Sequence, residues 1–263
     1  MTEWAWLASS ELMTPHVVSV AVIAARLLPV AFLCPLLGGQ VAPMTVKLGL
    51  VLSLALFLHA AAGIDAPVTD SSLSLVGLVF REFLVGTTLG LVAALPFDAA
   101  RMGGRFIDLF RGSSAEAALP MTGSKESAAG DALYQLLVAL CAAGFVMPLL
   151  LSSLFRSFTL VPPGAFTHGE AVITEVVHLV GTAFATGLAL GAPIAGVSLA
   201  VDAVMGLASR AAPQMNLQDT GAPLRILGGG AVLWLTVGLL TDRLLSFAVE
   251  TPEAVRTVLE LGR

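Results

Sequence analysis

Glu82 is the residue of this sequence with the clearest capacity for chemistry, because its carboxylate lies near the middle of an apolar run at residues 73–97. A carboxylate at the centre of a membrane-spanning helix costs about 3 kcal/mol unless it is paired or faces water. The neighbouring Arg81 points about 100° away around a helix, so it is a poor direct partner. Arg26, in an earlier apolar run, is a better candidate for an ion pair. A proton relay and a structural ion pair are both open at this point.

Ser198 lies in GVSLA at residues 196–200, the nearest approach to a nucleophile elbow. Such an elbow places its Ser at a strand-to-helix turn, whereas this Ser lies inside a long apolar run. His178 belongs to the same segment and cannot face Ser198 from another helix as a base. A hydroxyl bonded to its own helix backbone is the simpler interpretation. Since metal-protease, P-loop and dinucleotide-binding motifs are also missing, we expect no enzyme, no cofactor and no metal.

A polar stretch, ASRAAPQMNLQDTGAPLR at residues 208–225, separates two of the most apolar runs. It is framed by Pro213 and Pro223 and carries amide side chains but no charge cluster. A plain turn, an active-site loop and part of a gate are the interpretations to weigh. The stretch contains no nucleophile–base pair, which removes the active site from these three.

The composition places the elements around these residues in a membrane. Of the 263 residues, 57% are hydrophobic and 12% are charged, and the mean hydropathy is +0.92. A soluble domain is typically about 45–50% apolar and about 25% charged. The net charge of −5 and the lack of a basic patch exclude a nucleic-acid partner. Cys34 and Cys141 lie far apart in apolar runs, so we expect two buried free thiols.

Six apolar segments approach the roughly 20 residues that a membrane-spanning helix needs. They are too long for barrel strands and lack a two-residue alternation, so the sequence predicts an all-α, polytopic integral membrane protein. We expect one membrane domain over residues 1–263, with kinked helices. The segments are residues 16–38, 46–64, 73–97, 132–155, 176–207 and 224–249.

The connections between these segments predict an orientation and one unusual loop. Seven Lys and Arg residues lie in the first, third and fifth connections and one lies in the second and fourth, which puts both termini outside. The long connection at residues 98–131 begins with an amphipathic stretch of helical character. Its second half, SSAEAALPMTGSKESAAGD, is small and polar, so a flexible loop is expected there.

Small residues recur at four-residue spacing, which lines them along one face of a helix. Glycines at this spacing let another helix backbone approach closely. Ordinary packing within the chain and contacts with partner subunits both explain the pattern. The three faces comprise Glu82, Gly86 and Gly90; Gly104, Asp108 and Gly112; and Gly187 and Gly191.

Five stretches resemble motifs of the FliR/SctT family, the membrane export-apparatus proteins of flagellar and type III secretion systems, and they follow one another in the same order as in that family. Leu217-Gln218 and Gly144-Phe145 depart from the pattern usual in the family, which leaves the flagellar or injectisome branch open. The stretches are the Arg and spaced prolines from Arg26 to Lys47, EFLVGTTLG at 82–90, GGRFIDLFRG at 103–112, SFTLVPPG at 157–164 and RAAPQMNLQDTGAPLR at 210–225.

The resemblance implies a non-enzymatic subunit of an export gate that helps to form and close the inner-membrane pore for unfolded substrate proteins. Its partners would be two smaller membrane subunits, FliP/SctR-like and FliQ/SctS-like, and the switch and export-gate proteins of the same apparatus. It would lie in the bacterial inner membrane, within the secretion basal body. The resemblance also implies that much of the assembly sits at or above the outer face of the inner membrane, where the orientation predicted from ordinary spans no longer holds.

The resemblance also implies roles for particular residues. A loop near the middle of the chain acts as a plug, with an exposed cytoplasmic loop as the alternative, and its candidates are Asp108, Gly112, Ser113 and Ser114. The polar stretch becomes a helix break near the entrance or constriction of the pore. Its candidates are Arg210, Pro213, Gln214, Met215, Asn216, Gly221 and Pro223. Helix-packing and assembly roles fall to Arg26, Glu82, Gly86, Gly90, Gly104, Gly187 and Gly191.

The alternative function is a proton-coupled solute transporter that uses Glu82. Such a transporter predicts inverted repeats of discontinuous helices, and the sequence contains no convincing internal repeat. The export-gate subunit is therefore the leading hypothesis.

Overall fold

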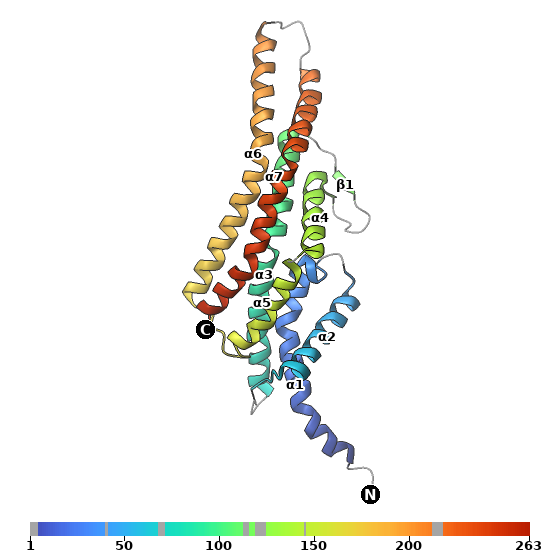
Figure 1. Ribbon diagram of the computed structural model, residues 1–263, viewed down its shortest axis with the longest axis vertical. Coiled ribbons are helices and arrows are strands. Elements are labelled where there is room, and N and C mark those ends of the chain that lie inside the picture. Colours follow the sequence, from blue (N-terminus) through green and yellow to red (C-terminus); the bar gives the residue numbers. More distant parts are fainter. Residues whose placement is uncertain are drawn as a thin grey trace. The chain divides into compact units, whose positions relative to one another are not determined.

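The computed structural model describes every residue except 1–4, 40–41, 68–71, 113–115, 119–124, 145 and 212–217. The elements follow one another from the N-terminus to the C-terminus, and the colours of Figure 1 run from blue to red in the same order. They are α1 (Ala5–Leu33), the short 3₁₀ helix η1 (Pro35–Leu37), α2 (Met44–Ala62), α3 (Ser72–Arg111), the strands β1 (Glu116–Ala118) and β2 (Lys125–Ser127), α4 (Ala128–Ala143), α5 (Val146–Leu160), α6 (Glu170–Ala211) and α7 (Gln218–Leu261).

The predicted helical membrane fold is confirmed. Within the described residues, five helices are long and apolar enough to cross a membrane, and α4 with α5 make a sixth if they form one broken span. Helices suit these runs because each satisfies its own backbone hydrogen bonds without water. Prolines lie inside α1, α3 and α6, which membrane helices tolerate better than soluble ones do.

Several boundaries differ from the prediction, and two of the differences change how the connections are interpreted. The third segment does not end at residue 97, because α3 continues through Pro96 to Arg111 over 40 residues. The amphipathic stretch is therefore the end of that helix and not part of a connection. The fourth segment, expected to be continuous over 132–155, is interrupted where α4 ends at Ala143 with Gly144 in an extended conformation.

The second half of the long connection contains more regular structure than the expected flexible loop. β1 and β2 pair in antiparallel fashion, with Glu116 opposite Ser127 and Ala118 opposite Lys125. β2 leads directly into α4. The pairing therefore brings the beginning and the end of this connection together at the N-terminus of α4.

The chain forms two compact units. Unit 1 comprises Met1–Ala94, Phe145–Leu179 and Thr251–Arg263, and unit 2 comprises Leu95–Gly144 and Val180–Glu250. The helices α3, α6 and α7 each contribute to both units. A single membrane domain over residues 1–263 therefore remains a prediction.

Unit 1 has an apolar core drawn from segments that are far apart in the sequence. α1 and α2 lie side by side as an antiparallel pair (Figure 1). Buried side chains of α3, α5 and the end of α7 complete this core, among them Leu89, Leu154 and Leu259. Each of these three is at most 2% exposed, so apolar burial is what holds the five segments together.

Candidate functional site

Arg26 of α1 and Glu82 of α3 form a buried ion pair in unit 1. Their Nε and Oε2 atoms are 2.5 Å apart, and the two side chains are 1% and 0% exposed. Glu82 therefore faces neither lipid nor water. This arrangement satisfies the rule that a charge inside a protein must be paired and hydrogen-bonded.

The last turn of α5 and the segment that follows it supply the remaining partners of this pair. The NH1 group of Arg26 donates to the carbonyl oxygens of Ser157 and Val161, at 3.0 Å each. The backbone N–H of Gly164 donates to Glu82 Oε1 at 2.7 Å. One carboxylate and one guanidinium thus join α1, α3 and the end of α5. We call Arg26, Glu82, Ser157, Val161 and Gly164 the buried polar network.

Aromatic and backbone geometry support this network. The guanidinium carbon of Arg26 lies 4.3 Å from the ring centroid of Phe158, a distance that permits a cation–π contact. Gly164 has a φ of +86°, a conformation that favours glycine and that turns its N–H toward Glu82. The NH2 atom of Arg26 is buried and has no hydrogen-bond partner among the described residues.

Gly86 and Gly90 allow α3 to approach α1 directly beside the ion pair. A Cβ atom at Gly86 would overlap with the backbone carbonyl of Arg26. A Cβ at Gly90 would lie 3.0 Å from the Cα of Val30 and 3.1 Å from the carbonyl oxygen of Pro29. The four-residue spacing therefore serves close packing within this chain, and it positions the backbone from which Arg26 reaches Glu82.

The other small-residue faces pack helices within unit 2. A Cβ at Gly104 of α3 would overlap with the backbone of Gly130 in α4. Gly187 of α6 lies against α3, where a Cβ would be 3.1 Å from the carbonyl oxygen of Ala99. A Cβ at Gly191 would lie 2.9 Å from the Cβ of Phe106.

Asp108, one of the plug candidates, caps a helix. Its side chain is buried, and Oδ2 accepts hydrogen bonds from Ser127 Oγ at 2.7 Å and from the backbone N–H of Ala129 at 2.9 Å. Ser127 Oγ in turn accepts from the N–H of Gly130. Negative charge and hydrogen-bond acceptors at a helix N-terminus stabilise it, so Asp108 holds the first turn of α4.

The remaining plug candidates lie at the point where α3 ends. Gly112 has a φ of +64°, which closes the helix in a left-handed conformation. Ser113 and Ser114 lie outside the described residues. Arg111 was not among the candidates, yet its NH2 donates to the carbonyl oxygen of Ile226 in α7 at 3.4 Å. A Cβ at Gly229 would lie 2.5 Å from the Cγ of Arg111, so this glycine makes room for it.

The gate candidates are only partly described. Pro213, Gln214, Met215 and Asn216 lie outside the described residues. Arg210, in the last turn of α6, and Pro223, near the start of α7, are exposed, whereas Gly221 is buried near Met205. Arg225 forms an ion pair with Asp202 of α6, with Nε and Oδ1 3.2 Å apart. The two helices are thus linked close to the polar stretch.

Ser198 is buried in α6, and its hydroxyl has no hydrogen-bond partner among the described residues. The expected bond to its own helix backbone is therefore wrong. Within the described part of the chain, no group of three or more His, Cys, Asp or Glu side chains is placed to hold a metal ion.

Sequence reasoning missed part of the buried polar network. Ser157, Val161 and Gly164 contribute backbone groups, whose positions residue types do not reveal. The signal that could have found them is the stretch SFTLVPPG itself, in which two prolines and a glycine mark a fixed turn.

The sequence of this chain is similar to one family of known proteins. Residues 17–250 match the family of bacterial export proteins, family 1. The chain is 27% identical over 234 residues to the flagellar biosynthetic protein FliR of Bacillus subtilis (strain 168), covering 86% of this chain and 89% of that protein. It is 29% identical over 195 residues to the Yop proteins translocation protein T of Yersinia pestis, covering 72% of each. It is 27% identical over 209 residues to the surface presentation of antigens protein SpaR of Shigella flexneri, covering 77% and 78%.

Proposed function

Because the chain belongs to the family of bacterial export proteins, family 1, we propose that it is a non-enzymatic subunit of a type III protein export gate. In this role it helps to form and to close a pore that passes unfolded proteins across the bacterial inner membrane. The observation that carries the proposal is the family match over residues 17–250, which includes both the buried polar network and the polar stretch at 208–225.

The buried polar network favours this function over a proton-coupled transporter. Glu82 makes hydrogen bonds through both carboxylate oxygens, to Arg26 and to Gly164, and is fully buried. A relay group must exchange its proton with water or with a neighbouring acid or base. Its position supports a structural role, in which it stabilises the helices that the assembly needs.

The polar stretch at 208–225 is the proposed gate. Irregular backbone at membrane depth is tolerated where it is buried in protein or lines an aqueous path. Arg210, near the end of α6, and Pro223, near the start of α7, are exposed and lie within this stretch. In the proposal its amide side chains satisfy the opened backbone, and Met215 offers a flexible apolar contact to the passing chain.

The connection between α3 and α4 is the proposed plug. Asp108 and Ser127 hold its two ends together, and Arg111 ties its first residue to α7. Small residues between such fixed ends can block a pore and move aside without breaking a packed core. The proposal therefore assigns the obstruction to the residues from Gly112 to Glu126 and assigns anchoring to Asp108.

The proposed partners are two smaller apolar membrane subunits of the same apparatus, FliP/SctR-like and FliQ/SctS-like, together with its switch and export-gate proteins. Apolar side chains exposed on α2, α3, α6 and α7 provide large surfaces that lipid or such subunits can cover. We expect the protein to reside in the inner membrane, within the secretion basal body.

The proposal is tested by deleting the gene and following protein secretion. Loss of the secreted flagellar or injectisome proteins, restored by the wild-type chain, is the expected result. A tagged chain should also copurify with small apolar partners. Normal secretion in the deletion strain contradicts the export function, and solute uptake by the chain alone in liposomes supports the transporter instead.

A further inference from the structure

Three consecutive glycines, Gly228 to Gly230, lie inside α7. Glycine is less favourable than alanine inside a helix, so a close approach is the physical reason to look for. A Cβ at Gly228 would make an ordinary contact, 3.5 Å from Cγ1 of Val197. A Cβ at Gly229 would lie 2.5 Å from Cγ of Arg111, and a Cβ at Gly230 would lie 3.4 Å from its NH2 atom. Gly229 and Gly230 therefore leave room for the side chain of Arg111, and we call this place in unit 2 the glycine notch.

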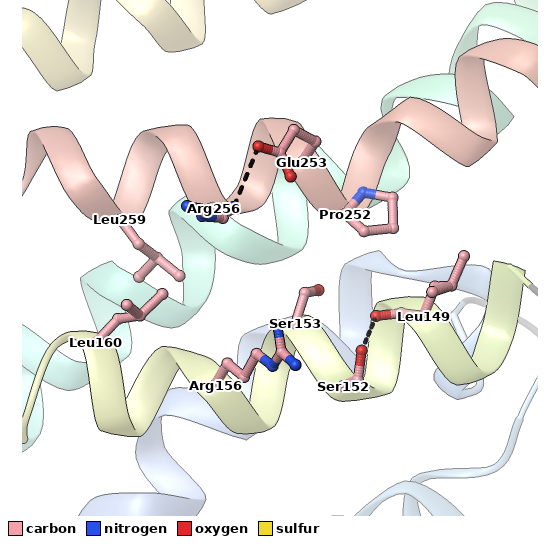
Figure 2. A pocket seen from close by; sticks show the side chains of 9 residues that line it. All are labelled: Leu149, Ser152, Ser153, Arg156, Leu160, Pro252, Glu253, Arg256 and Leu259. Carbon is pink, nitrogen blue, oxygen red and sulfur yellow. Dashed lines mark hydrogen bonds and ion pairs between the residues drawn. The ribbon is translucent and has the colours of Figure 1, made fainter.

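The polar contacts of Arg111 in the glycine notch are weak. Its NH2 group donates to the carbonyl oxygen of Ile226 at 3.4 Å, which is longer than the roughly 2.7–3.2 Å of a typical N–H···O hydrogen bond. Its Nε atom is buried and has no hydrogen-bond partner among the described residues. Figure 2 shows a contrasting arginine of unit 1, Arg256, which pairs with Glu253 and also with Glu260 at 2.8 Å. The fit of the stem, more than hydrogen bonding, holds Arg111 in its place.

Asp108, one turn earlier in α3, offers the guanidinium of Arg111 a second position. The NH1 atom of Arg111 and Oδ1 of Asp108 are 3.8 Å apart. Oδ2 of Asp108 accepts from Ser127 and Ala129, whereas Oδ1 accepts no hydrogen bond within the part of the chain that the structure describes. Residues three apart on a helix are neighbours, so a change of rotamer can bring the guanidinium to Oδ1. The side chain thus has one place that its stem fills and another that pairs its charge.

We propose that Arg111 is a releasable latch between the end of α3 and α7. While its side chain lies in the glycine notch, it fixes the last turn of α3 to α7. When the guanidinium turns to Asp108, it frees that turn. Leaving the notch gives up the packing of the stem and one long hydrogen bond, and it gains a closer ion pair, so a small difference in binding to the two states shifts the population between them.

The latch gives the proposed plug a defined release point. Arg111 is the last residue of α3, and the connection to α4 begins directly after it. In this respect the inference rests on the proposed function, because release of Arg111 frees the first residue of the connection that is proposed to obstruct the pore. The contact between Arg111 and the glycine notch can still be tested in the chain alone.

Gly229→Ala tests the latch, because the added methyl group overlaps with the stem of Arg111. Hydrogen exchange of the full chain in detergent should accelerate about tenfold at the amides of Leu109 and Phe110, because local opening of this turn becomes easier. Gly238→Ala is the matched control in the same helix, where nothing lies within 4 Å of the new Cβ. It should leave exchange at the end of α3 unchanged. Equal exchange in the two variants overturns the latch.

The double variant Gly229→Ala with Arg111→Ala separates a latch from ordinary packing. Removing the stem relieves the overlap, so the unfolding temperature should return to that of Arg111→Ala alone. Exchange at the end of α3 should nevertheless stay fast, because nothing fills the notch from α3. Exchange as slow as in the wild type overturns the latch and leaves the notch a packing feature. Arg111→Lys, whose stem still fits, should retain part of the protection.

Asp108→Asn tests the second position. The amide oxygen can still accept from Ser127, but the charge that attracts Arg111 away from the notch is gone. Exchange at the last turn of α3 should therefore become slower than in the wild type. Faster exchange there overturns Asp108 as the partner in the released state.

Conductance across membranes that contain the assembled complex distinguishes the latch from the proposed plug. Faster exchange in Gly229→Ala together with an ion leak supports both. Faster exchange with unchanged conductance supports the latch and contradicts the plug. Unchanged exchange overturns the latch and leaves the export function standing.

Discussion

The guanidinium of Arg26 and the carboxylate of Glu82, which are 56 residues apart in the sequence, meet inside unit 1 with 2.5 Å between Nε and Oε2. Both are buried, and the hydrogen bonds to Ser157, Val161 and Gly164 tie the pair to the last turn of α5 and to the segment that follows it. A buried pair of this kind fixes the helices that it joins, because each buried charge needs its partner. Removing one partner of such a pair lowers the stability of the protein strongly, even where the intact pair adds little net stability.

Glu82→Gln should destabilise the protein by about 3–5 kcal/mol, because it leaves the charge of Arg26 buried without a counter-ion. Thermal unfolding in detergent, followed by circular dichroism, measures the effect. The double variant Arg26→Met with Glu82→Gln removes both charges and should recover part of the loss. Arg81→Gln is the control, since Arg81 is exposed. An unfolding temperature for Glu82→Gln equal to that of the control contradicts the role of the pair.

Gly86→Ala should destabilise the packing of α1 against α3 by about 1–3 kcal/mol, because the added methyl group overlaps with the carbonyl of Arg26. Gly77→Ala is a matched control in the same helix, where nothing lies within 4 Å of the new Cβ. The control should stabilise the helix slightly, since Ala has the higher helix propensity. The unfolding temperature should therefore fall for Gly86→Ala and rise for Gly77→Ala. If both temperatures change in the same direction, the close approach of α1 does not explain the glycine at position 86.

Gly86→Leu extends this test to the proposed assembly. The larger side chain should abolish copurification with the small export partners, because α1 cannot occupy its place on α3. Normal complex formation by this variant would refute the packing role in assembly.

Asp108→Ala should loosen the first turn of α4 and cost about 1 kcal/mol, because Ser127 Oγ and the N–H of Ala129 lose their acceptor. Hydrogen exchange should accelerate at Ala129 and Gly130 more than in the middle of α4. Asp242→Ala, which removes an exposed carboxylate from α7, is the control. Unchanged protection at Ala129 is the result that rules out the cap.

Deletion of residues 113–118 should leave assembly intact and make the pore leaky to ions, if this connection is the plug. Conductance across membranes that contain the assembled complex is the measurement. Substituting Ser113 and Ser114 with Ala keeps the length of the connection and should keep the pore closed. Unchanged conductance after the deletion leaves the export function standing and removes the plug assignment.

Cys34 should resist alkylation in the folded protein at pH 8, because burial raises the pKa of its thiol from 9.0 to about 11. The free energy of unfolding is highest below pH 9, where the thiol is protonated in both states. It falls as the pH rises from 9 to 11, because the thiol then ionises in the unfolded state but not in the folded state. Maleimide labelling followed by mass spectrometry should therefore show rapid modification of Cys34 only after unfolding. Fast labelling of the folded protein at pH 8 contradicts the buried position of the thiol.

The sequence by itself determined the membrane class, the helical fold, the family and the close-packing glycines. These conclusions depend on local composition and on spacing along one helix. In lipid, only helices and closed barrels satisfy the backbone hydrogen bonds, so few folds fit such a composition. Gly86 illustrates this, because its position four residues from both Glu82 and Gly90 already places the three on one face. The family resemblance was visible for a similar reason, since its motifs are contiguous stretches.

Only the tertiary structure decided which partners the polar residues have. The sequence indicated Arg26 as a candidate partner of Glu82. The backbone groups of Ser157, Val161 and Gly164 could be identified as partners only from the structure, in which α5 packs beside α1 and α3. Asp108 proved to be a cap of α4 for the same reason. Hydrogen bonds and ion pairs act over a few ångströms, and the distances between segments far apart in the chain are set by the packing of the whole unit.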